Sequence, residues 1–285
     1  MSGVRAGRAL SARHLPTLLG ALIVGATVLI ALAAPLLAPH NPFTQHLTQR
    51  LIPPEWLPGG SGAHPFGTDQ LGRDYLSRML YGARISLLIG TLTVLASGAI
   101  GTTLGLLGGY FAGRVDDVVM FVITTRLAVP LILVALTVVA LVGSSLTVVI
   151  LVLALLLWDR FAVVSRTATM QVRTLDYIAA ARAAGCSHAR ILVSEVLPNI
   201  LNHLVVIATL EMALAILLSA ALSFLGLGVP PPLPDWGLMI AEAETYMFFS
   251  PWVIMIPGLA LFVLVLGINL LGDGLRDLLA VARAG

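Results

Sequence analysis

The chain has 285 residues, of which 58% are hydrophobic and only 11% are charged. A soluble domain has about a quarter of its residues charged, so this composition excludes a water-soluble globular protein and indicates an integral membrane protein. The net charge is only +2. Arginines flanking membrane spans produce such an excess by themselves, so we expect no nucleic-acid partner.

The residue types that are missing exclude several kinds of chemistry. All 16 basic residues are arginine, and without lysine the chain has neither a Walker A phosphate loop nor a Schiff-base amine. Cys186 is the only cysteine, and none of the six histidines lies in an HExxH motif, so we expect no metal site. The sequence therefore predicts no catalytic residue and no cofactor, and any ATP hydrolysis must come from a partner.

Charge-poor segments predict the membrane spans, since about 20 apolar residues cross a bilayer. The segment 118–158 is long enough for two spans, and Gly143, Ser144 and Ser145 supply the turn between them. We therefore expect an all-α, polytopic protein with six transmembrane helices. They lie in segments 15–38, 85–112, 118–158 (two), 196–223 and 252–271.

The distribution of arginine predicts the orientation. With the N-terminus in the cytoplasm, eleven arginines lie inside, four lie outside and Arg126 lies within a span, which satisfies the positive-inside rule. Both termini are then cytoplasmic. The expected divisions are a cytoplasmic tail (1–14), a first span (15–38), an extracytoplasmic segment (39–84), a membrane core (85–272) with a cytoplasmic loop (160–196), and a second cytoplasmic tail (273–285).

The two extracytoplasmic segments carry their own patterns. In the first, Thr68 is a candidate cap, and Asp69/Arg73 and Asp74/Arg78 are acid-before-base pairs at i,i+4, which predicts a helix lying on the membrane surface. In the second (226–250), Asp235, Glu242 and Glu244 form a small acidic group, for which a solvated loop is the simplest interpretation.

Two charges, Arg126 and Glu211, fall inside predicted spans. A charge within a membrane is costly and usually faces the interior of the helix bundle. Three interpretations remain open: the two residues form a buried ion pair, they line a translocation path, or Arg126 snorkels to the interface.

The cytoplasmic loop contains the most informative pattern. Thr174 is a candidate N-cap, Asp176 suits the positive end of a helix, and five alanines follow before Gly185 ends the helix. A second helix is expected from Ser187 toward Leu197 and Pro198. Such a rigid two-helix elbow, with small side chains, suits docking in a cleft on another protein. The alternative is an ordinary alanine-rich connector.

At this point the sequence resembles a known family. Ala180-Ala181-x-x-x-Gly185, followed by Leu197-Pro198, is similar to the EAA loop of ABC importer permeases. Other motifs, in the same order and spacing, resemble the C-type permeases of dipeptide, oligopeptide and nickel importers. They are His64-Pro-Phe-Gly-Thr-Asp-Gln-Leu-Gly-Arg-Asp74, Gly82-Ala-Arg-Ile-Ser86, Gly108-Gly-Tyr-Phe111 with Asp116-Asp117, Ala221-Leu-Ser-Phe-Leu-Gly-Leu-Gly228, Asp235-Trp-Gly237 and Asn269-Leu-Leu-Gly-Asp-Gly-Leu-Arg-Asp277.

The resemblance implies a type I ABC importer permease fold in a bacterial inner membrane. This chain would form half of a pathway with a sister permease, and two cytoplasmic ATPases would bind ATP and Mg. A binding protein would deliver di- or oligopeptides and could contact Asp235, Glu242 and Glu244. One alternative is the same architecture importing nickel or another small solute. A stand-alone transporter, the other alternative, leaves the elbow unexplained.

The same resemblance assigns roles within the elbow. It implies that Tyr177, Ala180, Ala181, Arg182 and Gly185 lie in the groove of the ATPase, and that Leu197 and Pro198 anchor the elbow to the fifth span. The acidic position of the motif is Ala179 here, and Asp176 or Arg182 is the candidate to replace its docking role.

Overall fold

The computed structural model describes residues 2–281, and side chains from 15 to 279. This part of the chain contains helices and turns, two isolated bridges, and no strand. The helices in chain order are α1 (Ser2–Leu37), η1 (Leu47–Gln49), α2 (Tyr75–Phe111), α3 (Gly113–Ala128), α4 (Leu131–Val142), α5 (Leu146–Leu156), α6 (Asp159–Val172), α7 (Asp176–Ala183), α8 (His188–Arg190), η2 (Ile191–Val196), α9 (Leu197–Phe224), α10 (Trp236–Ala243), η3 (Glu244–Tyr246) and α11 (Trp252–Val281).

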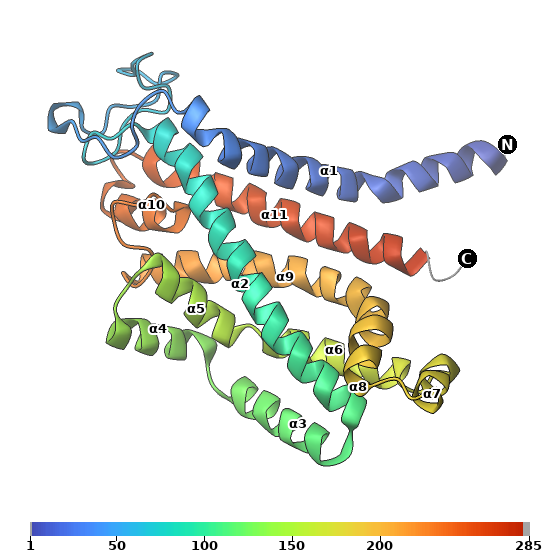
Figure 1. Cartoon of the computed structure of the whole chain (residues 1–285). Coiled ribbons are helices and arrows are strands. Elements are labelled where there is room, and N and C mark those ends of the chain that lie inside the picture. The colour runs from blue at the N-terminus through green and yellow to red at the C-terminus, as the bar shows by residue number, and fades with distance from the viewer. Residues whose placement is uncertain (1, 282–285) are drawn as a thin grey trace.

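Long apolar helices run between two ends of the molecule (Figure 1). One end, here called the loop end, holds residues 39–74 and α10, and the other, the elbow end, holds α7 and α8. The start of α1 and the end of α11 both lie at the elbow end. α1 packs along α11, while α2 crosses both α6 and α9.

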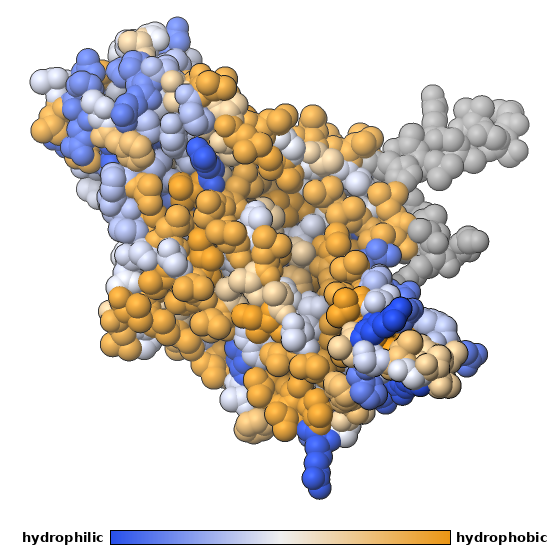
Figure 2. All heavy atoms as spheres, in the orientation of Figure 1, coloured by the Kyte–Doolittle hydropathy of each residue, from blue (hydrophilic) through white to orange (hydrophobic). Residues whose placement is uncertain are grey.

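Five helices of the described residues are long and apolar enough to cross a membrane, and a sixth span results if the bent pair α3–α4 counts as one. The bend of 83° falls at Pro130, where proline disfavours a helical residue before it. Figure 2 shows apolar side chains along the helices and polar side chains gathered at the two ends. The predicted all-helical membrane fold is confirmed, and the six predicted spans correspond to these five segments and the bent pair α3–α4.

The predicted surface helix does not exist. Residues 67–74 form turns in which Gly67 and Gly72 adopt positive φ values of 77° and 72°. A Cβ on Gly72 would collide with the carbonyl oxygen of His46, so this turn requires glycine. The helix begins only at Tyr75 and continues to Phe111 as the second span. Its cap is Asp74, which accepts hydrogen bonds from the Ser77 backbone N (2.8 Å) and Oγ (2.6 Å).

The end of the fourth span and the start of the fifth differ from the prediction, whereas the turn between α4 and α5 is as expected. The fourth span continues to Val172 rather than ending near Trp158, and the fifth begins at His188 rather than at Val196. Both differences arise at charged residues that interrupt the apolar sequence but not the span: Asp159 and Arg160 in the fourth span, and Glu195 in the fifth. The turn between α4 and α5 lies where predicted: Gly143 has φ 99°, and the Ser145 side chain caps α5.

Glycines allow α2 to lie directly against α6. A Cβ on Gly105 would lie 2.5 Å from the carbonyl oxygen of Ala162, and one on Gly109 would lie 2.6 Å from that of Arg166. Only small residues permit helix backbones to approach this closely. Arg166 also forms an ion pair with Asp116 of α3, so α6 is held from two sides.

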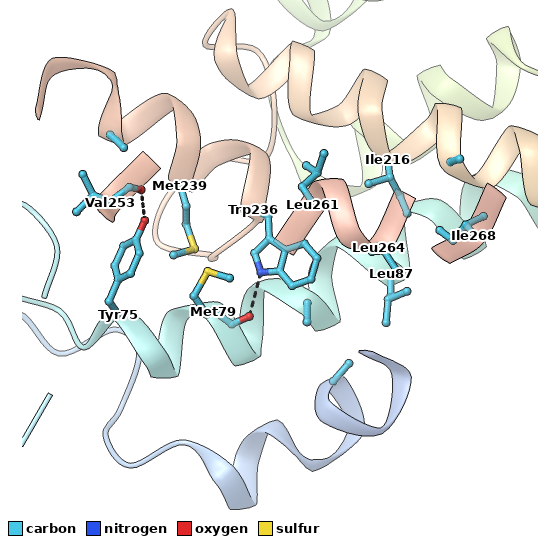
Figure 3. Packing of buried hydrophobic residues seen from close by; sticks show 14 residues of the cluster. Tyr75, Met79, Leu87, Ile216, Trp236, Met239, Val253, Leu261, Leu264 and Ile268 are labelled. Carbon is cyan, nitrogen blue, oxygen red and sulfur yellow. Dashed lines mark hydrogen bonds between the residues drawn. The ribbon is translucent and has the colours of Figure 1, made fainter. Parts of the chain in front are cut away.

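At the loop end, α2, α10 and α11 share a buried cluster (Figure 3). The indole N–H of Trp236 donates to the carbonyl oxygen of Met79 at 3.0 Å, and the Tyr75 hydroxyl donates to the carbonyl oxygen of Val253. A buried aromatic residue whose polar atom is paired fixes orientation as well as position. These contacts join the start of α2 to the segment that follows the fifth span.

Candidate coupling elbow and charged groups of the spans

The first arm of the elbow is α7. It begins at Asp176 after the extended residue Leu175, which makes no side-chain cap. The predicted cap by Thr174 is wrong, because the Thr174 hydroxyl instead donates to the carbonyl oxygen of Gln171 at 2.8 Å. Asp176 lies in the first turn as expected, where the positive end of the helix dipole favours a carboxylate.

Gly185 forms the corner of the elbow. Its φ is 80°, and its N–H donates to the carbonyl oxygen of Arg182 at 3.0 Å, while the Cys186 N–H donates to that of Ala181 at 3.1 Å. A Cβ on Gly185 would meet nothing within 4 Å, so backbone conformation alone requires glycine here. Ser187 then caps the second arm by accepting a hydrogen bond from the Arg190 N–H.

One side of the elbow is anchored and the other is open. Ile178 is fully buried in a cluster that includes Ile191, Val196 and Tyr110. Tyr177 is 40% exposed, and Ala180 and Arg182 are exposed as well. The elbow is therefore fixed to the helices while it presents small and polar groups outward.

Tyr110, near the C-terminal end of α2, joins both arms. Its hydroxyl lies 3.0 Å from His188 Nδ1, the Arg182 guanidinium carbon lies 4.8 Å from the centre of its ring, and its carbonyl accepts a hydrogen bond from Arg173 at 3.2 Å. The ring face attracts the cation. Sequence reasoning missed this role, and the available signal was the aromatic pair that follows Gly108 and Gly109 at the end of a span.

The second arm continues directly into the fifth span. α8, the π-helical turn η2 and α9 form one run from His188 to Phe224. Leu197 packs on the same cluster as Ile178, and Leu197 and Pro198 directly follow the π-helical turn. The elbow is thus continuous with α9.

The charges within the spans pair differently from the predicted pairing. Arg126 contacts the carbonyl oxygen of Leu156 and lies 3.8 Å from Asp159, whereas Glu211 accepts a hydrogen bond from Arg160 at 3.1 Å. Of the three interpretations, the Arg126–Glu211 ion pair is wrong, because Asp159 and Arg160 lie within the fourth span and each partners one of the two charges. The expected role of Arg126 and Glu211 in a translocation path stays a prediction.

The acidic group at the loop end is largely interior. Glu242 pairs with Arg73 at 3.0 Å and Arg78 at 2.9 Å, and both arginines also pair with Asp69. Burial raises the pKa of Glu242, an effect that Arg73 opposes. Only one of the two expected i,i+4 pairs forms: Asp69 and Arg73 meet at 2.6 Å, while Asp74 faces two histidines.

Asp235 is 2% exposed and caps α10. Burial raises the pKa of its carboxyl, and hydrogen bonds from Ser86, Leu238 and Ser223 lower it in part. Asp235 therefore lies outside any outward-facing acidic group. Of the three acidic residues, Glu244 remains exposed.

His40 and His64 approach Asp74, although the sequence predicted no metal site. Their Nδ1 atoms lie 3.6 Å and 2.8 Å from Asp74 Oδ1, and the three groups have the proximity that a metal ion needs. The contacts with Ser77 described above already explain the position of Asp74. His64 adds a buried hydrogen bond to this cap.

Comparison with known proteins identifies the family. Residues 101–282 match the model of the binding-protein-dependent transport system inner membrane component, and residues 12–54 match the N-terminal transmembrane domain of oligopeptide transport permease C. The di/tripeptide transport system permease protein DppC of Pseudomonas aeruginosa is 44% identical over 91% of this chain and 86% of its own length. The dipeptide transport system permease protein DppC of Escherichia coli is 42% identical over 94% and 89%.

Solved structures agree on the fold. The inward-facing MetNI methionine ABC transporter matches with a TM-score of 0.59 and 20% identity over 73% of this chain and 96% of the other. Identity at this level supports the fold alone, whereas the family match covers more than half of the chain. The chain is thus a member of the family of binding-protein-dependent transport system inner membrane components, with the type I ABC importer permease fold.

Proposed function

We propose that this chain is one of two permease subunits of an ATP-driven importer for di- and oligopeptides. The observation that carries the proposal is the elbow. Its inner side is fixed by Ile178 and Tyr110, and its outer side is open to a partner. The names of the 42–44% identical relatives support peptides as the cargo.

The residues of this chain indicate which functions its partners must supply. The chain supplies no nucleotide-binding lysine, so two cytoplasmic ATPases bind ATP and Mg. Their grooves receive the exposed residues Tyr177, Ala180 and Gly185, while Ala181 packs on the inner cluster of the elbow. Arg182 has a second role on the inner side, because its guanidinium lies over the Tyr110 ring. The elbow end is cytoplasmic, together with both chain termini.

The loop end faces outward and receives a substrate-binding protein, with exposed Glu244 as the candidate contact of the acidic group. A sister permease completes the pathway, and lipid surrounds the remaining apolar surface. Peptides carry charged termini that cross hydrocarbon very slowly. Alternating access then requires only that the nucleotide-bound ATPases favour one arrangement of the two permeases over the other.

The test is affinity isolation of this chain from its native membrane, followed by measurement of ATP hydrolysis with and without peptide and binding protein. Recovery of a second permease and an ATPase, with peptide raising ATP turnover, is the expected result. Stimulation by nickel in place of peptide would transfer the assignment to the small-solute importer. Isolation of the chain alone, with transport that needs no ATP, would contradict the proposal.

A further inference from the structure

We propose that Arg160 binds the C-terminal carboxylate of the peptide as it crosses the membrane. The inference rests on the proposed function and adds to it a residue, a ligand group and a place on the path. Arg160 is the fifteenth residue of the 27-residue span Leu146–Val172. Twelve residues, about 18 Å of helix, separate it from Val172 at the end of this segment.

The first observation is that the Arg160 side chain is exposed although it lies within a candidate membrane span. The Arg160 side chain is 59% exposed, whereas its partner Glu211 is fully buried. An exposed charge near the middle of a span faces a protein or a water-filled cavity rather than lipid. Under the proposed function, Arg160 therefore lies on a side of α6 that faces the sister permease or the pathway between the two subunits.

The second observation is the hydrogen-bonding capacity that remains on the guanidinium. Within the described residues, Arg160 makes one side-chain hydrogen bond, from Nη1 to Glu211 Oε1 at 3.1 Å. A guanidinium has five N–H donors in a planar fork that matches a carboxylate. Glu211 thus holds Arg160 in place and leaves donors for an incoming anion.

The local backbone favours the same kind of ligand. Arg160 lies in the first turn of α6, because the helical run is interrupted between Leu156 and Asp159. The positive end of a helix dipole attracts anions. Asp159, in the same turn, is 7% exposed and is turned toward Arg126, so it does not occupy the exposed side.

A hollow lies one helical turn beyond Arg160, although Arg160 is not among the residues that line it. Its volume is about 410 Å³, and its lining includes Val164, Leu210, Asn202 and Arg276. Val164 lies one helical turn beyond Arg160 on the same face, and Leu210 precedes Glu211. A cavity of this volume is in the range that holds small ligands, so it offers room near Arg160 for the body of a dipeptide.

The experiment compares two peptides through two transporters. Complete complexes containing wild-type chain or Arg160→Gln are reconstituted with the same binding protein, and the uptake of alanyl-alanine and of alanyl-alanine amide is measured. The binding protein's own preference cancels because it is common to both. We expect the variant to take up the free acid about tenfold or more slowly, since a charge-assisted contact is lost, with amide uptake unchanged.

Two further variants sharpen the result. Arg160→Lys keeps the charge and recovers part of the free-acid uptake. Arg114→Gln removes an exposed arginine at the start of α3 and leaves the uptake of both peptides unchanged. If amide uptake is too slow to measure, the test is whether the complex without binding protein retains labelled alanyl-alanine. We expect the wild-type complex to retain this peptide and the Arg160→Gln complex not to retain it.

The remaining outcomes overturn either this inference or the proposed function. An equal fall for both peptides, or failure of Arg160→Gln to assemble with the sister permease, assigns Arg160 to structure and overturns the inference. Unchanged uptake or retention overturns it as well. A wild-type complex that imports no peptide would contradict the proposed function itself, and is distinguished by the wild-type measurement alone.

Discussion

The carboxyl group of Asp235 is enclosed at the loop end, where three elements meet. It accepts a hydrogen bond from Ser86 of α2 at 2.8 Å and from the Leu238 N–H of α10 at 3.2 Å. Burial nevertheless outweighs these bonds and raises its pKa. The carboxylate thus fixes α10 against α2, and it does so at the free-energy cost of losing its hydration.

This shift predicts a pH dependence with a definite sign. Because the folded state holds the proton more tightly than the unfolded state, its contribution to the free energy of unfolding falls as pH rises from about 3.9 through the raised pKa. The wild type should therefore gain melting temperature relative to Asp235→Asn when detergent samples are acidified from pH 7 toward pH 4. A difference between the two proteins that stays constant with pH would contradict this account.

For individual charges, the sequence predicts the location within a span but not the partner. Arg126 and Glu211 were correctly placed inside spans, since an apolar context around a charge is visible in the sequence. Their partners were not, because pairing depends on how α3, α6 and α9 are arranged in space. Asp159 and Arg160 carried no sequence signal that they lay mid-span rather than at its end.

Among the elements, the elbow was the most predictable. Its helix, its glycine corner and its second start at Ser187 all depend on local rules that operate within a few residues. Tyr110 was not predictable as the joint between the arms, because it lies more than 60 residues away along the chain. The predicted surface helix does not form for a local reason. Gly67 and Gly72 adopt positive φ values and make turns, although the spacing of the charges favours a helix.

Gly185→Pro should uncouple transport from ATP hydrolysis. Proline fixes φ near −65° and removes the N–H that donates to Arg182, so the elbow cannot keep its angle. We expect peptide import per ATP to fall about tenfold while membrane insertion is unchanged. The matched control is Gly143→Pro, since Gly143 also has positive φ and donates its N–H to a helix carbonyl but lies in the α4–α5 turn. Import at the wild-type ratio by Gly185→Pro would refute coupling through this corner.

The contact between α2 and α6 makes a separate prediction. A methyl group on Gly105 meets the backbone of α6, which cannot yield as a flexible side chain can. Gly105→Ala should lower the free energy of unfolding by about 1–3 kcal/mol, the usual cost of overpacking. Gly98→Ala on the same helix places its Cβ 3.4 Å from the Phe161 ring and should cost far less. Equal melting temperatures for the two variants would show that the helices are not held this closely.

At the scale of the molecule, α2 links the two ends. Its 37 residues span about 55 Å, with Tyr110 against the elbow and Tyr75 against the first turn of α11. Under the proposed function, α2 and α9, which continues from the elbow, give a docked ATPase two connections to the loop end. A preference of the ATPase for one elbow position then becomes a preference for one state of the pathway.

The most direct test of this account is site-specific cross-linking in the assembled complex. The single cysteine is first removed by Cys186→Ser, and Tyr177→Cys or Glu244→Cys is then introduced; both positions are exposed and lie at opposite ends of the molecule. We predict that Tyr177→Cys cross-links to the ATPase and that Glu244→Cys does not. Cross-linking of the ATPase to Glu244→Cys but not to Tyr177→Cys would contradict both the orientation and the role of the elbow.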